Sequence, residues 1–86
     1  MKLLIQIPCF NEAETLPSVL ETIPKSIQGI DIIETVVIDD GSSDDTVKVA
    51  KSLGVNHIIS NIGNKGLAYS FRTGLDYAIS QNADIL

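Results

Sequence analysis

Two adjacent carboxylates, Asp39 and Asp40, lie between an apolar run and a cluster of Gly, Ser and Asp. The run, residues 32–38, is rich in β-branched side chains and predicts a buried strand. The cluster, residues 41–46, predicts a tight turn that leads into a helix. The carboxylates are therefore expected where a strand ends, which is the edge of an open α/β sheet at which ligands bind. Turn chemistry alone is a second interpretation, because Asp and Ser bend loops and cap helices without any ligand.

Glu12 is a further acidic residue expected at this edge. The turn at residues 8–12 follows an earlier strand, and in a parallel sheet it should lie beside the turn at 39–42. Glu12 and Asp40 would then face one crevice, where acceptor-only groups suit ribose hydroxyls and the imide N–H of uracil or guanine. They would repel a phosphate, so the diphosphate of a nucleotide is expected elsewhere, near a cation. Glu12 also suits the first turn of a helix without any ligand.

The elements that position these residues repeat one order: an apolar strand, a polar turn and an amphipathic helix. Strands are expected at residues 2–7, 32–39 and 55–60, and helices near 15–23, 44–53 and 67–80. This alternation predicts a three-layer α/β/α fold with a mainly parallel sheet. Residues 83–86 read as a fourth strand, inside which the chain is expected to be truncated. The helix residues expected to face the sheet are Leu16, Val19, Leu20, Ile23, Val47, Ala50, Leu53, Ala68, Phe71, Leu75, Ala78 and Ile79.

Composition and charge argue against several classes of partner. The 86 residues carry a net charge of −5 and no Lys/Arg cluster, so nucleic acids and anionic membrane surfaces are not expected as partners. No apolar run approaches the ~20 residues of a transmembrane segment. The single cysteine, Cys9, excludes an internal disulfide, is expected to be a small packed hydrophobe, and fits a reducing compartment.

Several familiar sites are missing from the sequence. It has no Gly-x-Gly-x-x-Gly after the first strand and no P-loop. The acidic turn is not a calcium loop, since Asp44 stands at the glycine position and Ala50 at the glutamate position. One His and one Cys cannot form a zinc cluster. His57 is expected to be structural, and Lys65 and Arg72 are expected on the solvated surface, with contact to a phosphate as the alternative.

Three segments, in order and spacing, resemble the N-terminal half of family 2 glycosyltransferases, in the dolichyl-phosphate mannosyltransferase-like and polyprenyl-glycosyltransferase branch. They are Ile-Pro-Cys-Phe-Asn-Glu at 7–12, Val-Val-Ile-Asp-Asp-Gly-Ser-Ser-Asp-Asp-Thr at 36–46, and Asn-Ile-Gly-Asn-Lys-Gly-Leu-Ala at 61–68, followed by Gly74, Leu75 and Ala78. The resemblance implies that residues 1–86 form the nucleotide-binding half of a GT-A fold. It also implies that the donor nucleotide contacts Pro8, Phe10, Glu12 and Asp40, and that Asp39 is structural.

The resemblance further implies an inverting transfer of a sugar from a UDP- or GDP-sugar to an acceptor such as a polyprenyl phosphate, a lipid or a polysaccharide. The family's Asp-x-Asp metal motif and catalytic base follow the fourth strand. Residues 1–86 are therefore expected to be a fragment that holds no catalytic residue and no metal, whereas the full-length enzyme needs Mg²⁺ or Mn²⁺. Its expected place is the cytoplasm or the cytoplasmic face of the membrane. Two alternatives are a non-catalytic nucleotide-binding or regulatory module, and a structural piece of a larger domain.

Overall fold

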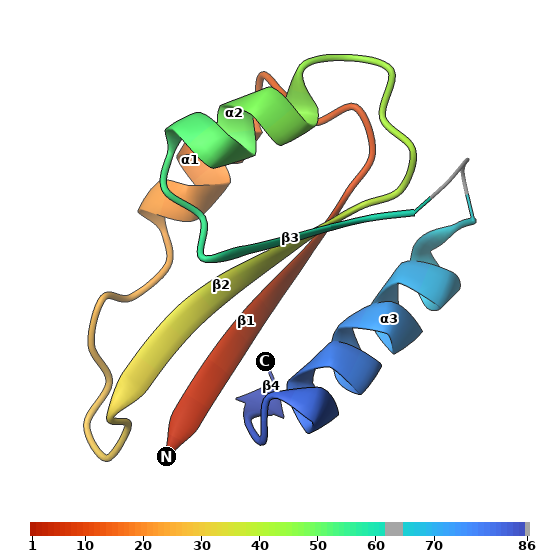
Figure 1. Cartoon of the computed structure of the whole chain (residues 1–86). Helices are drawn as coiled ribbons and strands as arrows, with labels where there is room; N and C mark the ends of the chain where they lie inside the picture. Colours follow the sequence, from red (N-terminus) through yellow and green to blue (C-terminus); the bar gives the residue numbers. More distant parts are fainter. Residues whose placement is uncertain (62–64, 86) are drawn as a thin grey trace.

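The computed structural model describes residues 1–61 and 65–85 and shows a parallel sheet with helices on both faces (Figure 1). Within these residues the sheet has four strands in the order β3-β2-β1-β4, all paired in parallel. The elements are β1 (Lys2–Cys9), α1 (Leu16–Glu21), β2 (Ile32–Asp39), α2 (Thr46–Ser52), β3 (His57–Ser60), α3 (Leu67–Ser80) and β4 (Asp84–Ile85). The expected three-layer α/β/α fold is confirmed. Gly63 and Asn64 of the glycine-rich segment, and Leu86 of the expected fourth strand, lie outside the described residues.

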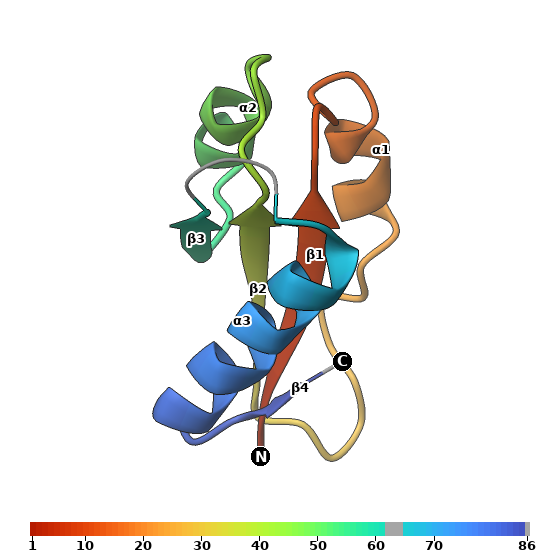
Figure 2. The ribbon, with the colours of Figure 1, turned by 90° about the vertical axis from the view of Figure 1, so that its right-hand side faces the viewer.

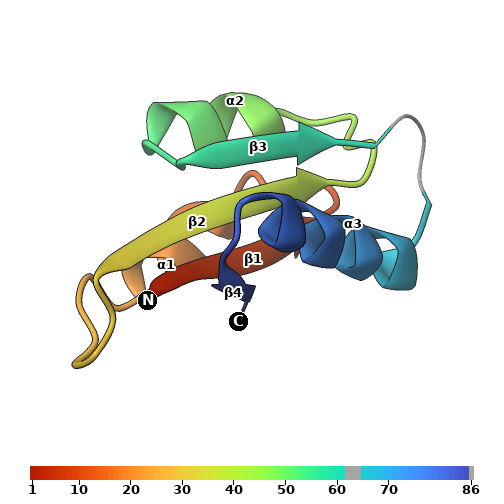
Figure 3. The ribbon, with the colours of Figure 1, turned by 60° about the horizontal axis from the view of Figure 1, so that its bottom comes forward.

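The helices are divided between the two faces of the sheet. Figures 2 and 3 show α1 and α2 on one face and α3 on the other. The chain runs outward from β1 to β2 and β3, and then returns through α3 to place β4 on the free side of β1. Because such crossovers are right-handed, a reversal of direction moves the helix to the opposite face. The reversal creates a topological switch point beside β1, where open α/β sheets bind ligands.

The core on the α1 and α2 face matches the expectation in part. Its buried cluster consists of Cys9, Leu16, Val37 and Ala50. Leu53, expected inward, is 45% exposed because α2 ends at Ser52 and Leu53 is its C-terminal cap residue.

Among the helices of the described residues, none has the length and apolarity that crossing a bilayer requires.

The expected inward face of α3 is wrong in part. Ala68 is exposed, and Phe71 and Ile79 are 49% and 76% exposed. Ala78 is buried as expected, but Ser70 and Gly74, which were not expected inward, are buried beside it. The reason is close packing: a Cβ at Gly74 would lie 2.9 Å from Ile38 Cδ1. The periodicity of the helix predicted that its large apolar side chains face the sheet. Because α3 lies close to the sheet, only small side chains fit between them.

The strand β1 is longer than expected and includes Pro8 and Cys9. In the described chain β4 pairs with Leu3 and Leu4 alone, so Pro8 lies beyond the pairing on that side of β1. A proline is tolerated there because no ladder hydrogen bond from its nitrogen is required. The extension carries β1 to the same edge as Asp39, with which Cys9 is in register.

Candidate functional site

A cavity of about 270 Å³ opens at the carboxyl ends of β1 and β2, beside the start of α3. It is lined by Pro8, Cys9, Phe10, Glu12, Asp40, Gly66 and Ser70. The four residues expected to contact a nucleoside, Pro8, Phe10, Glu12 and Asp40, therefore surround one space. The cavity lies at the switch point of the sheet, so topology and side-chain chemistry point to the same place.

Asp40 is buried and is held by three N–H donors. Its Oδ1 accepts hydrogen bonds from Lys65 N at 2.8 Å and Asn61 Nδ2 at 3.2 Å, and its Oδ2 accepts from Gly66 N at 2.8 Å. These bonds, above all that from Lys65 N, hold the pKa of Asp40 below its usual value. Gly66 has a φ of +92°, a conformation that glycine adopts at little cost. The carboxylate is therefore ionised at neutral pH and fastens the start of α3 to the end of β2.

Asn61 and Ser70 are site residues that the sequence reasoning missed. The Asn61 Nδ2 group donates to both Asp40 Oδ1 and Ser70 Oγ, at 3.2 Å each. Ser70 is fully buried in the first turn of α3 and lines the cavity. A polar residue on the buried side of a helix would have marked Ser70 as a candidate site residue. The sequence did not show which side of α3 faces the sheet, so this signal could not be used.

Asp39, the last residue of β2, and Asp40, the residue after it, have different hydrogen-bond partners. Asp39 is 4% exposed, its Oδ2 accepts a long 3.4 Å bond from Ser42 N, and its Oδ1 has no hydrogen-bond partner among the described residues. The sequence predicts a structural role for Asp39 and ligand contact for Asp40. The hydrogen bonds add a structural role to Asp40, which has more protein partners than Asp39.

Phe10 and Glu12 form the outer wall of the cavity. Phe10 is 44% exposed and lines the cavity, so part of its side chain is accessible to a ligand. The exposed Glu12 accepts a hydrogen bond from Thr15 Oγ1 on its carboxylate, and its carbonyl oxygen accepts from Leu16 N at 2.9 Å. Glu12 thus lies at the rim of the cavity, in the turn that precedes α1. The alternative that placed it in the first turn of a helix is wrong, because α1 begins at Leu16 and has no acidic residue in its first turn.

Cys9 lines the cavity and also belongs to the core cluster beneath α1 and α2. Burial, with nearby carboxylates contributing, raises the pKa of its thiol to about 11. The thiol is therefore protonated at neutral pH and packs as a small hydrophobe, as expected.

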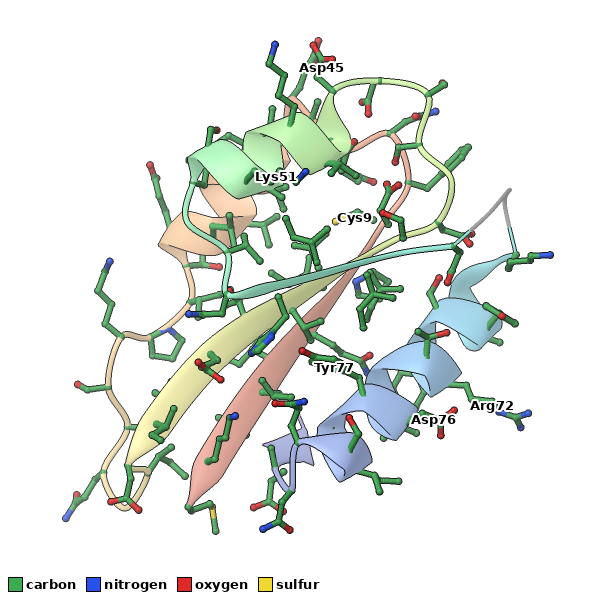
Figure 4. All side chains as sticks on the ribbon, viewed as in Figure 1. Cys9, Asp45, Lys51, Arg72, Asp76 and Tyr77 are labelled. Carbon is green, nitrogen blue, oxygen red and sulfur yellow. The ribbon has the colours of Figure 1, made fainter. Side chains whose placement is uncertain are left out.

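Lys65, Arg72 and His57 are not among the residues that line the cavity. Lys65 and Arg72 are exposed, and Arg72 points outward from α3 together with Asp76 (Figure 4). His57 is half-buried and hydrogen-bonded to Glu34 and Tyr77, which agrees with a structural role. The part of the chain that the structure describes holds no group of three or more His, Cys, Asp or Glu side chains arranged to bind a metal.

The family model of glycosyl transferase family 2 matches residues 4–82. The chain belongs to glycosyl transferase family 2. An undecaprenyl-phosphate 4-deoxy-4-formamido-L-arabinose transferase from Proteus mirabilis is 38% identical over 68 residues, covering 74% of this chain and 21% of that protein. A polyprenol monophosphomannose synthase from Mycolicibacterium smegmatis is 27% identical over 88 residues, covering 96% of this chain and 32% of that protein.

The fold of this family 2 chain also occurs in a solved structure. The mannosyltransferase PcManGT from Pyrobaculum calidifontis, in complex with GDP-Man and Mn²⁺, matches with a TM-score of 0.76 and 24% identity. The match covers 90% of this chain and 24% of that chain, and it confirms the expected GT-A type of fold. The chain thus spans about a third or less of these proteins.

Proposed function

We propose that this protein is an inverting glycosyltransferase in which residues 1–86 bind the nucleotide of a nucleotide-diphosphate sugar. The observation that carries this proposal is the single cavity shared by Pro8, Phe10, Glu12 and Asp40. The aromatic ring of Phe10 suits the face of a base. The carboxylates of Glu12 and Asp40 suit the ribose hydroxyls and the N–H groups of uracil or guanine.

A GDP- or UDP-sugar is the proposed donor, and a lipid-linked acceptor such as a polyprenyl phosphate is the proposed acceptor. Support comes from the mannosyltransferase solved with GDP-Man and from relatives named for undecaprenyl phosphate and polyprenol. A lipid-linked acceptor and a buried free thiol at Cys9 fit a place at the cytoplasmic face of a membrane.

The described residues do not fit a cation site, since no three candidate ligands converge. The acidic wall of the cavity would also repel a diphosphate. We therefore expect residues 1–86 to contribute nucleotide binding rather than the metal ligands. Mg²⁺ or Mn²⁺, and the residues that hold it, belong to the whole protein in this proposal, which the solved mannosyltransferase with Mn²⁺ supports.

A non-catalytic nucleotide-binding or regulatory module is the second candidate function. The observation that favours it is the cavity itself, which gathers groups suited to binding while the described residues supply no metal cluster. Donor turnover by the whole protein separates the two candidates. A transferase should consume a GDP- or UDP-sugar in the presence of Mg²⁺ or Mn²⁺ and stop when a chelator is added, whereas a module should bind the nucleotide without turnover.

Titration calorimetry with UDP and GDP tests nucleotide binding by the 86-residue chain. Glu12→Gln should weaken the affinity for the nucleotide that binds, by about tenfold, because a charge-assisted acceptor becomes a neutral one. Asp76→Asn is the matched control, since Asp76 lies on the outer face of α3 and carries the same charge (Figure 4). Absence of binding by the unmodified chain, or equal loss in both variants, would contradict the proposed site.

A further inference from the structure

The loops after β1 and β2 are joined by hydrogen bonds that centre on Asn11. Its backbone N–H donates to Ser42 Oγ at 2.8 Å. Its side-chain Oδ1 accepts from Ser43 N at 2.8 Å and from Asp44 N at 3.3 Å. Asn11 therefore binds three consecutive residues of the opposite loop, Ser42 through its backbone N–H and Ser43 and Asp44 through its side chain.

Asp44 and Thr46 add a second set of bonds between the same loops. Asp44 Oδ2 accepts from Ala13 N at 3.2 Å, and Thr46 Oγ1 accepts from Glu12 N at 2.9 Å. Asp44 Oδ1 in turn accepts from Thr46 N at 3.0 Å, which ties the two acceptors together. We name these connected residues, Asn11, Ser42, Ser43, Asp44 and Thr46, the loop clamp.

Asn11 lies between the two residues that form the outer wall of the cavity, Phe10 and Glu12. Its φ is +54°, in the left-handed region that non-glycine residues seldom adopt, although Asn tolerates it better than most. This turn of the backbone sets the directions of the residues before and after it. Asn11 itself is exposed and does not line the cavity, so its bonds act on the neighbouring residues rather than on a ligand.

We propose that Asn11 is a positioning residue whose hydrogen bonds to the 42–44 loop hold Phe10 and Glu12 at the nucleotide cavity. This inference rests on the proposed function of that cavity. Binding loops need a rigid support if their side chains are to be preorganised for a ligand. Within the loop clamp, Asn11 supplies that support from an exposed position, where its own contribution to the buried core is small.

Three substitutions of Asn11 separate the acceptor oxygen from the backbone conformation. Asn11→Asp keeps an acceptor and tolerates a positive φ, Asn11→Gly keeps the φ alone, and Asn11→Ala keeps neither. Asn82→Ala is the matched control, because Asn82 has a φ of +52° at the distant end of α3. It imposes the same backbone penalty without touching the loops.

The first measurement is the rate of hydrogen exchange at the backbone amides of Ser43 and Asp44, monitored by NMR. Exchange should accelerate in Asn11→Gly and Asn11→Ala, and remain slow in Asn11→Asp and Asn82→Ala. Unchanged exchange in Asn11→Gly would show that the side chain does not clamp the loops. This result overturns the inference whether or not a nucleotide binds.

The second measurement is the dissociation constant for UDP and GDP. Asn11→Gly should bind about tenfold more weakly, and Asn11→Asp within about threefold of the unmodified chain, because a preserved acceptor preserves the loop. Accelerated exchange with unchanged affinity overturns the positioning role and leaves the proposed function intact. If the unmodified chain binds neither nucleotide, the proposed function and the positioning role both fail.

Discussion

The backbone N–H of Gly66 donates a 2.8 Å hydrogen bond to Oδ2 of Asp40, which joins the residue preceding α3 to the residue following β2. The other oxygen accepts from Lys65 N at the same distance. Asp40 therefore lines the cavity and also fastens α3 to the sheet. A change at this residue must be measured on stability and on ligand affinity together.

Asp40→Asn should lower both the stability of the fold and the affinity for a nucleotide. An amide has one acceptor oxygen, so its NH₂ group would face the N–H of either Lys65 or Gly66. Asp40→Asn should unfold at a lower urea concentration than Asp39→Asn. Among the described residues, Asp39 has one weak bond and an Oδ1 without a partner, so its replacement removes less. A larger loss of stability from Asp39→Asn would contradict the structural role that these hydrogen bonds give to Asp40.

Stability should fall in acid. The pKa of Asp40 is lowered chiefly by the bond from Lys65 N, that of Asp44 by Thr46, and that of Glu34 by His57. A carboxyl whose pKa is lower in the folded chain stabilises the fold above its unfolded pKa of about 4 and stops doing so as pH falls through the folded value. As far as these three carboxyls determine it, the urea concentration at the unfolding midpoint should therefore stay constant from about pH 7 to 5 and decrease below about pH 4. In Asp40→Asn the decline should be shallower, and an unchanged slope would contradict the contribution of Asp40.

Gly74→Ala should destabilise the protein although alanine favours helices. A Cβ there would lie 1.8 Å from Gln6 Oε1 and 2.9 Å from Ile38 Cδ1. Overpacking of this kind costs about 1–3 kcal/mol, which outweighs the gain in helix propensity of about 1 kcal/mol. Thermal unfolding should show a lower Tm, and the double variant Gln6→Ala/Gly74→Ala should recover part of it. A Tm equal to or above that of the unmodified chain would mean that α3 can move away from the sheet.

Tyr77→Phe should lower stability by about 1 kcal/mol, the usual net contribution of one hydrogen bond. The Tyr77 hydroxyl lies 2.7 Å from His57 Nδ1, and His57 Nε2 lies 3.1 Å from Glu34 Oε1, which Lys2 Nζ also contacts at 3.1 Å. This network joins α3 to strands near their amino ends, away from the cavity at their carboxyl ends. Nucleotide affinity should be unchanged, so a matched fall in affinity would show that the two ends of α3 are coupled.

Much of the fold and part of the site could be predicted from local patterns. The bounds of β2 and α3 matched residues 32–39 and 67–80, because a β-branched run and a long amphipathic segment are strong local signals. The alternation of strands and helices then placed Glu12 and Asp40 at one edge of the sheet, since right-handed crossovers allow few arrangements. These patterns also predicted that Cys9 is packed and that His57 is structural.

Only the tertiary structure decided which stripe of α3 faces the sheet and which polar residues support the cavity. Periodicity gives the position of apolar residues around a helix, but the distance between helix and sheet determines whether Phe71 or Gly74 fits against Ile38. The bonds of Asn11 to Ser43, and of Asn61 to Asp40, join residues that are far apart in the sequence. Such contacts depend on how two loops approach each other in space, and no local propensity of either loop contains that information.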